Sequence, residues 1–119
     1  PAVSPTHIHS VKKGDVSNHA MQMVNGRTRL KGLIVCGNAV DVNSGNLKLY
    51  NGDSSAGTIE LEMDIGDYSA YGGTQMIRIP GNGILFDSGI YMEKSYSGPA
   101  STGRGVLSVV AIYQGGAAA

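Results

Sequence analysis

The residues that could bind a metal ion form two short clusters in the sequence. The first is His7 and His9, which alternate along an extended segment, and a third imidazole is available only from His19. The second is acidic and consists of Glu60, Glu62, Asp64 and Asp67. Alternate residues of a strand lie on one side about 7 Å apart at their Cα atoms. At that spacing neither cluster completes a zinc or calcium site without ligands from elsewhere. We therefore expect no metal site.

The acidic cluster has two remaining interpretations. One is a solvated face of a strand, because Glu60, Glu62 and Asp64 alternate with apolar residues. The other is a binding face for a basic segment, and the chain contains such a segment in Lys12-Lys13. A neighbouring copy of the chain could dock there.

Candidate nucleophiles lie in settings that argue against catalysis. Gly52-Asp53-Ser54 matches the nucleophile motif of the GDSL hydrolases, but it follows Asn51-Gly52, which is a strong hairpin signal. The only cysteine, Cys36, ends the apolar run Leu33–Cys36, which is typical of a buried thiol that acts as a small hydrophobic group. Gly81 and Gly83 open no helix, so they form no dinucleotide-binding motif. We expect no catalytic residues, no cofactor and no enzymatic activity.

Tyrosines are the remaining chemical signal. The chain has six tyrosines and no tryptophan, and Tyr68 and Tyr71 share the predicted loop Asp67–Gly73. Tyr91 and Tyr96 form a second group. Aromatic loops of this kind are compatible with a carbohydrate-binding module or with a protein interface. We take Tyr68 and Tyr71 as candidate partner-binding residues.

The elements that position these residues are short strands. Val106–Tyr113 is apolar on both sides, so this strand must be covered on both faces, in the middle of a packed sheet or at an interface. Ile59, Leu61, Met63 and Ile65 alternate with polar residues and are expected to face inward. No segment has the apolar period of an amphipathic helix. The predicted strands are 19–25, 27–36, 47–50, 58–65, 74–79, 84–86, 90–92 and 106–113.

This pattern predicts an all-β protein, an antiparallel β-sandwich of jelly-roll or Greek-key kind. A length of 119 residues suits one domain. We expect an extended arm over 1–18, a single sandwich over 19–114 and a flexible tail over 115–119. Charged residues make up only 15% and glycines number 18, which favours a β protein whose surface is partly covered by neighbours.

The net charge of zero conceals an asymmetry between the two parts of the chain. Residues 1–31 carry five cations and one acid, a balance of +4, whereas the other 88 residues carry four cations and eight acids, a balance of −4. Five cations over 31 residues do not make a dense patch, so we expect no nucleic-acid partner. No run of about 18 apolar residues predicts a membrane span, and we expect no membrane partner and no signal peptide.

The first 18 residues are predicted to form an arm that binds a surface of this chain or of a partner. Pro1, Pro5 and Gly14 interrupt any regular element, yet the segment keeps several apolar residues. A frayed terminus is the alternative. The candidate partner-binding residues in the arm are Val3, Ile8, Val11, Lys12, Lys13 and Val16.

Two segments of the second half of the chain resemble a known group of proteins. Ile79-Pro-Gly-Asn-Gly-Ile-Leu-Phe-Asp-Ser-Gly-Ile-Tyr91 and the closing Val106–Tyr113 are similar to the corresponding part of small virion proteins of tailed bacteriophages. The resemblance covers roughly the last forty residues and contains no catalytic motif.

The resemblance implies a β-sandwich structural protein of the virion. We expect a decoration, or cement, protein on the capsid exterior that binds the major capsid protein and copies of itself, as a homotrimer. Its location would be the virion surface after synthesis in the host cytoplasm. A neck or tail protein of the phage and a carbohydrate-binding β-sandwich module are the alternatives.

Overall fold

The protein is all-β and its strands pair antiparallel in a computed structural model that describes residues 8–13, 20–37, 45–65, 73–96 and 106–119. No helix occurs within these ranges. The strands are β1 (Ile8–Lys13), β2 (Ala20–Gly37), β3 (Gly45–Asn51), β4 (Thr58–Ile65), β5 (Gly73–Arg78), β6 (Ile84–Phe86), β7 (Gly89–Tyr96) and β8 (Val106–Ala118).

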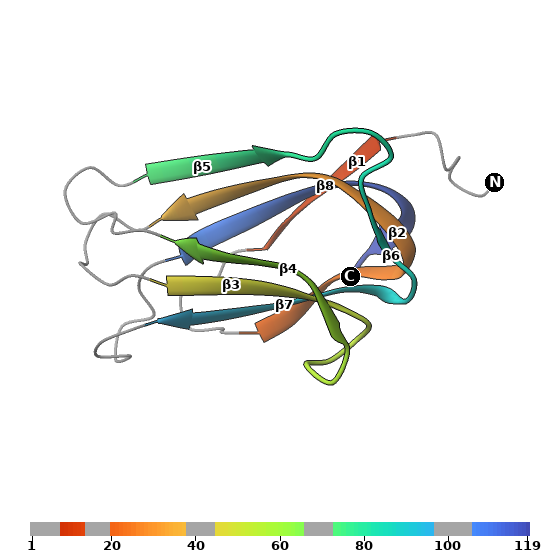
Figure 1. The fold of residues 1–119 in the computed structure, drawn as a ribbon, viewed down its shortest axis with the longest axis horizontal. Helices are drawn as coiled ribbons and strands as arrows, with labels where there is room; N and C mark the ends of the chain where they lie inside the picture. Colours follow the sequence, from red (N-terminus) through yellow and green to blue (C-terminus); the bar gives the residue numbers. More distant parts are fainter. Residues whose placement is uncertain (1–7, 14–19, 38–44, 66–72, 97–105) are drawn as a thin grey trace.

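The strands form a sandwich of two sheets (Figure 1). The first sheet has the order β1-β8-β2-β5 and the second has the order β2-β7-β3-β4. Every neighbouring pair in both sheets is antiparallel, and β6 adds a short ladder to the middle of β2. Two four-stranded antiparallel sheets connected in this way are a jelly roll, which confirms the predicted fold class.

Strand β2 belongs to both sheets because it bends in the middle. Its first part, Ala20–Asn25, pairs with β7, and its last part, Gly32–Gly37, pairs with β5. The bend lies at Gly26, whose φ of 83° is a conformation that glycine adopts without steric cost. The sequence predicted two separate strands here, 19–25 and 27–36. The structure joins them into one strand that turns the corner between the sheets.

Strand β8 follows β2 around the same corner. Its pairing with β2 shifts between Asn25 and Thr28, opposite Gly115 and Gly116, and both glycines have positive φ. A Cβ at Gly116 would lie 2.3 Å from Thr28 Oγ1 and 2.7 Å from Val24 Cγ1. β8 therefore continues past the predicted end at Tyr113, and residues 115–118 of the predicted tail pair with β2.

The core fills the space between the two sheets. Leu33 and Val109 reach it from the first sheet, and Leu49 and Met92 reach it from the second, all four with 0% exposure. Burying side chains of this size contributes about 1.5–3 kcal/mol each. Among the described residues, the buried core cluster consists of Met23, Val24, Leu30, Leu33, Val35, Leu47, Leu49, Phe86, Ile90, Met92, Val109, Ala111 and Tyr113.

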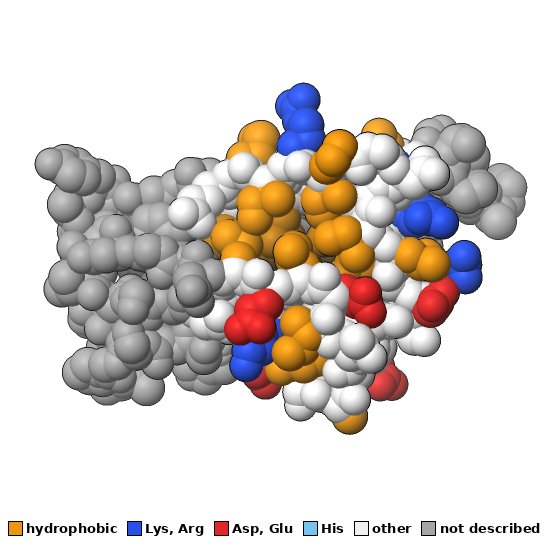
Figure 2. All heavy atoms as spheres, in the orientation of Figure 1, with side chains coloured by type: hydrophobic (Ala, Val, Ile, Leu, Met, Phe, Trp, Pro, Cys, Tyr) orange, Lys and Arg blue, Asp and Glu red, His pale blue; other side chains and the backbone are white. Residues whose placement is uncertain are grey.

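The sandwich is less well closed along its β4–β5 side. Figure 2 shows hydrophobic side chains in the band between these two strands, with acidic side chains beside them. The apolar residues that pack against the core there are only half-buried: Leu61, Met63, Ile77, Ile79 and Ile84. In the part of the chain that the structure describes, no helix is long and apolar enough to cross a membrane.

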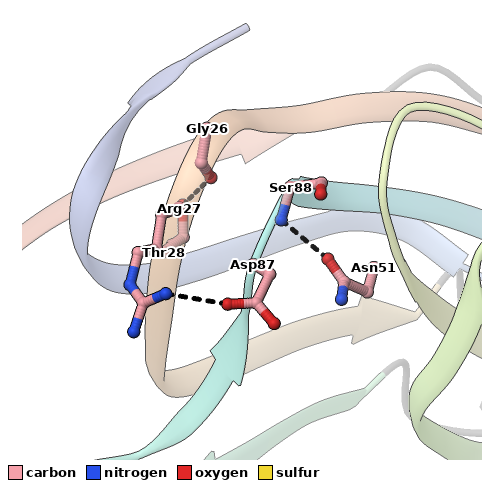
Figure 3. A network of polar contacts seen from close by, with 6 residues as sticks. All are labelled: Gly26, Arg27, Thr28, Asn51, Asp87 and Ser88. Carbon is pink, nitrogen blue, oxygen red and sulfur yellow. Dashed lines mark hydrogen bonds and ion pairs between the residues drawn. The ribbon is translucent and has the colours of Figure 1, made fainter.

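The hairpin predicted from Asn51-Gly52 is present with a longer loop. Strands β3 and β4 end their pairing at Asn51 and Thr58, so the loop spans residues 52–57. Only Gly52 of the pair has a positive φ, 139°. Asn51 instead accepts a hydrogen bond at Oδ1 from the backbone N–H of Ser88, 2.8 Å away, and so ties this loop to the start of β7 (Figure 3).

Candidate interaction surface

The outer face of the first sheet carries apolar side chains that the described residues leave partly exposed. In β8, Val109, Ala111 and Tyr113 point into the core and are buried. Val110 and Ile112 alternate with them and are half-buried on the opposite side. The sequence predicted that both sides of β8 would be covered in the sheet or at an interface. Within the described chain the second side is covered only in part.

The pairing register extends this apolar side across three strands. Val110 lies opposite Ile34 of β2, and Ile34 lies opposite Met76 of β5. Side chains directly opposite each other on one face are about 4.5–5.5 Å apart at Cβ, so these residues form a continuous row. Met76 is 65% exposed. We name the row and Ile112 the outer apolar face, which consists of Ile34, Met76, Val110 and Ile112.

Gly32 makes a shallow hollow in the outer apolar face. It lies opposite Ile112 on one side and Arg78 on the other. A Cβ at this position would be 3.4 Å from Ile112 Cδ1, so the isoleucine occupies the space above the glycine. The hollow has a volume of about 170 Å³ and is lined by Lys31, Gly32, Met76, Ile77, Arg78 and Ile112.

Cations surround the outer apolar face. Lys12 lies opposite Val110 on β1, and Arg78 lies opposite Gly32 on β5. Both are exposed. Lys31 is half-buried and donates from Nζ to the carbonyl oxygen of Gly81 at 3.1 Å. The sequences of β1, β2, β5 and β8 contain no aspartate or glutamate. This arrangement suits a partner surface that is apolar at its centre and acidic at its edge.

The outer face of the second sheet is different because its polar groups bond to one another. Tyr50 donates its hydroxyl to Glu93 Oε1 at 3.1 Å, and Asn46 Nδ2 donates to Glu62 Oε2 at 3.0 Å. The Tyr50 ring also packs against Tyr91, with centroids 6.3 Å apart. Desolvation, with smaller effects from the hydrogen bond and the charge of Glu93, raises the pKa of Tyr50 above its usual value. Several polar groups of this face are therefore bonded within the protein.

A β-bulge in β4 reverses the side on which one residue, Ile59, was predicted to lie. Leu49 pairs with Leu61, but the next residue, Tyr50, pairs with Ile59, so Glu60 is an extra residue in β4. The extra residue moves Ile59 to the outer face beside Tyr50, where it is 43% exposed. The expectation that Ile59 faces inward is wrong. Leu61 and Met63 do pack against the core, while Glu60 and Glu62 are exposed as predicted.

The structure separates the predicted partner-binding residues of the arm into two groups. Ile8 is 63% exposed and Lys12 is exposed, so both are accessible in β1. Val11 packs against the core, and Lys13 Nζ donates to the carbonyl oxygen of Ala119. Residues 8–13 thus form the edge strand of the first sheet. Val3, Val16, Tyr68 and Tyr71 lie outside the described residues.

Of the three histidines considered as metal ligands, only His9 is described. His9 packs against Tyr113 with ring centroids 5.7 Å apart, and His7 and His19 lie outside the described ranges. Among the described residues, no group of three or more His, Cys, Asp and Glu side chains could hold a metal ion. The Cys36 side chain lies outside the description.

A second, polar hollow lies at the corner where β2 bends. Its volume is about 340 Å³, and Arg27 at its rim forms an ion pair with Asp87 at 2.9 Å (Figure 3). Thr28 is buried there and donates from Oγ1 to the carbonyl oxygen of Gly26 at 2.7 Å. Arg27 and Asp87 are both more than half exposed, so this pair contributes little to stability. The lining residues are Arg27, Thr28, Arg29, Asn82, Leu85, Gln114 and Gly115.

Sequence reasoning missed Ile34 and Met76 as surface residues. Both belong to runs that look like ordinary core strands, Leu33–Cys36 and Thr74–Ile79. The pairing register places Ile34 outside, next to Val110, and places Met76 next to Ile34. The available signal was the apolar character of both sides of β8, which required a cover on its second side.

Neither a protein-family model nor a curated protein matches the chain. Its fold is similar to chains in solved structures of viruses. A chain from the cryo-EM structure of broad bean stain virus has 13% identity and a TM-score of 0.39, over 84% of this chain and 61% of that one. A chain from Desmodium yellow mottle tymovirus has 11% identity and a TM-score of 0.41, over 100% and 86%. A chain from the T13 IBDV viral particle has 10% identity and a TM-score of 0.43, over 91% and 31%.

Proposed function

We propose that this protein is a structural component of a virus particle, a decoration protein on the capsid exterior that stabilises the shell. The observation that carries this proposal is the outer apolar face. It runs from the central strands β8 and β2, where Val110, Ile112 and Ile34 are only half-buried, to the edge strand β5, where Met76 is 65% exposed. Contiguous apolar surface with a polar rim marks a protein interaction site. The partners would be the major capsid protein and copies of this chain, assembled as a homotrimer.

Two further observations support the proposal. Jelly rolls serve as capsid and lectin domains. The segments that resemble phage virion proteins form β6, the start of β7 and most of β8, and they supply the core residues Phe86, Ile90 and Val109. The resemblance therefore concerns the residues that build this fold, and the outward side of β8 belongs to the same segment.

Attachment would place the outer apolar face against the shell. Ile112 and Met76 would supply the apolar contact, and Lys12 and Arg78 would face acidic groups at its edge. Ile8, next to this face on β1, would extend the contact. Electrostatic attraction of exposed cations is screened by salt, whereas apolar contact is not. We expect attachment to persist at high salt with a reduced rate of binding.

The test is the copy number of this protein per virus particle. It is measured by quantitative mass spectrometry of particles purified from the virus that encodes the protein. Hundreds of copies per particle are expected for a decoration protein. A copy number that matches a single ring would support the alternative, a neck or tail protein. Absence from purified particles would overturn the proposal.

A pair of variants tests the face itself. Met76→Glu should abolish attachment to particles, because it places a charge in the centre of the contact. Ser54→Glu, at an exposed position in the loop 52–57, is the matched control and should attach normally. Equal attachment of the two variants would remove the outer apolar face from the mechanism.

A carbohydrate-binding module is the second candidate, because the polar hollow gathers two arginines and two side-chain amides at one corner. Tyr50 is not available to stack on a sugar, since it is only 6% exposed. A glycan array with the isolated protein discriminates the two functions. Specific binding that Arg29→Ala abolishes would favour the module.

A further inference from the structure

Strands β1 and β4 are the two ends of the paired sheet. The order of pairing runs β1-β8-β2-β7-β3-β4, so each of these strands has a strand neighbour on one side only, among the residues described. A strand edge without a neighbour presents backbone N–H and C=O groups that can pair with another chain. Apolar residues are exposed on both strands, since Ile8 is 63% and Ile59 is 43% exposed.

The two edges carry opposite charges. The β1 sequence Ile-His-Ser-Val-Lys-Lys contains two lysines and no acid, and the β4 sequence Thr-Ile-Glu-Leu-Glu-Met-Asp-Ile contains three acids and no cation. Lys12, Glu60 and Glu62 are exposed. Like charges directly opposite each other destabilise a strand pair, and opposite charges stabilise it. Pairing of β1 with β1, or of β4 with β4, is therefore disfavoured.

We infer that β1 of one copy of this chain pairs edge to edge with β4 of a second copy. The remaining free edge, β5, contains Arg78 and no acid, so it does not compete with β4 for the lysines. The sides of the strands also match. Val11 on β1 and Leu61 and Met63 on β4 point toward the cores of their own copies, and Lys12 and Glu62 point outward.

The contact lies beside the less well closed side of the sandwich. The free edge of β4 borders the band of half-buried apolar residues seen in Figure 2. A neighbour that docks along β4 would turn its Val11 toward this band. Its exposed Ile8, on the same side of β1 as Lys12, would lie on the outward side of β4, where Ile59 is also exposed. The apolar contact adds to the charge attraction between β1 and β4.

The contact is heterologous, because two different edges meet. Heterologous contacts close into rings when the rotation between copies allows it, and otherwise form open chains. The inference uses only the isolated protein, so its test does not depend on attachment to a particle. It can fail while the proposed function holds, and the reverse is also possible.

The experiment measures self-association of the full chain by sedimentation velocity and multi-angle light scattering. The variants are Lys12→Glu and Glu62→Lys, and Asp53→Lys is the matched control, because Asp53 is an exposed acid outside β4. We expect the wild type and the control to form the same oligomer. Each of the other two variants should weaken self-association by about tenfold or more.

Recovery of assembly is the decisive part. The double variant Lys12→Glu/Glu62→Lys should recover the wild-type oligomer, because the charges are exchanged and still complementary. An equimolar mixture of the two single variants should also assemble, in alternation. Circular dichroism and thermal unfolding identify any single variant that fails to fold, in which case the double variant and the folded single variant decide. A monomeric wild type, or a double variant as weak as the single variants, would overturn the inference.

Discussion

The two sheets of this jelly roll share a core and a corner, but they differ in what they present outward. Strands β1, β2, β5 and β8 contain six cations and no acid. Strands β3, β4 and β7 contain two lysines and four acids. The first sheet exposes an apolar row with cations around it, whereas the second sheet joins Tyr50, Glu93, Asn46 and Glu62 by hydrogen bonds.

The outer faces of the two sheets therefore suit different surroundings. Hydrogen-bonded polar groups face water at little cost, so the outer face of the second sheet, apart from the exposed Ile59, leaves less apolar surface for a partner to cover. The exposed and half-buried apolar side chains of the first sheet gain further burial free energy only when another surface covers them. The charge asymmetry read from the sequence therefore becomes, in the fold, a contrast between a face suited to association and a face suited to solvent.

The largest expected effect is at the corner that joins the two sheets. Gly116→Ala combines a left-handed φ of 63° with a Cβ only 2.7 Å from Val24 Cγ1, and should lower the free energy of unfolding by about 4 kcal/mol. Gly81→Ala is the matched control, since its φ is 67° and nothing lies within 4 Å. The control should cost about 1 kcal/mol. Chemical denaturation measures both, and equal losses would mean that the corner is not tightly packed.

The next effect compares the same residue type on the two sides of the sandwich. Met92 is 0% exposed in the second sheet, and Met76 is 65% exposed on the first. Met92→Ala should lower the free energy of unfolding by about 3 kcal/mol. Met76→Ala should change it by less than about 0.5 kcal/mol. A large loss for Met76→Ala in the monomer would show that the outer apolar face serves folding, which would break the comparison between the sheets.

The smallest effect is a pH dependence of the second sheet. The pKa of Tyr50 is raised in the folded protein, chiefly by desolvation and then by Glu93, so the folded state favours the protonated hydroxyl. The stabilisation is complete below the usual tyrosine pKa of about 10 and is lost as the pH rises from there through the raised value. Denaturant unfolding at pH 8 and at higher pH should show this loss, and Tyr50→Phe should reduce it. An unchanged slope in the variant would contradict this assignment.

The sequence was sufficient to predict most of the fold. Short runs with a period of two, separated by turn residues, predicted the class, the absence of helices in the described parts and the strands near Leu47, Thr74, Ile84 and Ile90. These features are local, because side-chain alternation and turn chemistry depend on adjacent residues. The apolar character of both sides of Val106–Tyr113 also predicted a strand that needs a second cover.

The features that the sequence did not reveal depend on pairing between distant strands. The single bulge at Glu60 reverses the direction of Ile59, and nothing in the local alternation marks it. Lys94 is 1% exposed on the strand β7, where its charge would predict an outward position. The glycines at 115 and 116 read as a soft tail, yet they let β8 follow the bend of β2. Ile34 lies on the outer face through its register with Val110 of β8, and Met76 through its register with Ile34 of β2.

The placement of β8 beside β1 has a consequence for synthesis. Residues 8–13 pair with residues 109–114, so the earliest described strand has no neighbour until the latest one is made. A ribosome must translate almost the whole described chain before the first sheet can close, and such distant pairings fold slowly. Until β8 is made, a nascent chain exposes the unclosed first sheet to solvent and to chaperones.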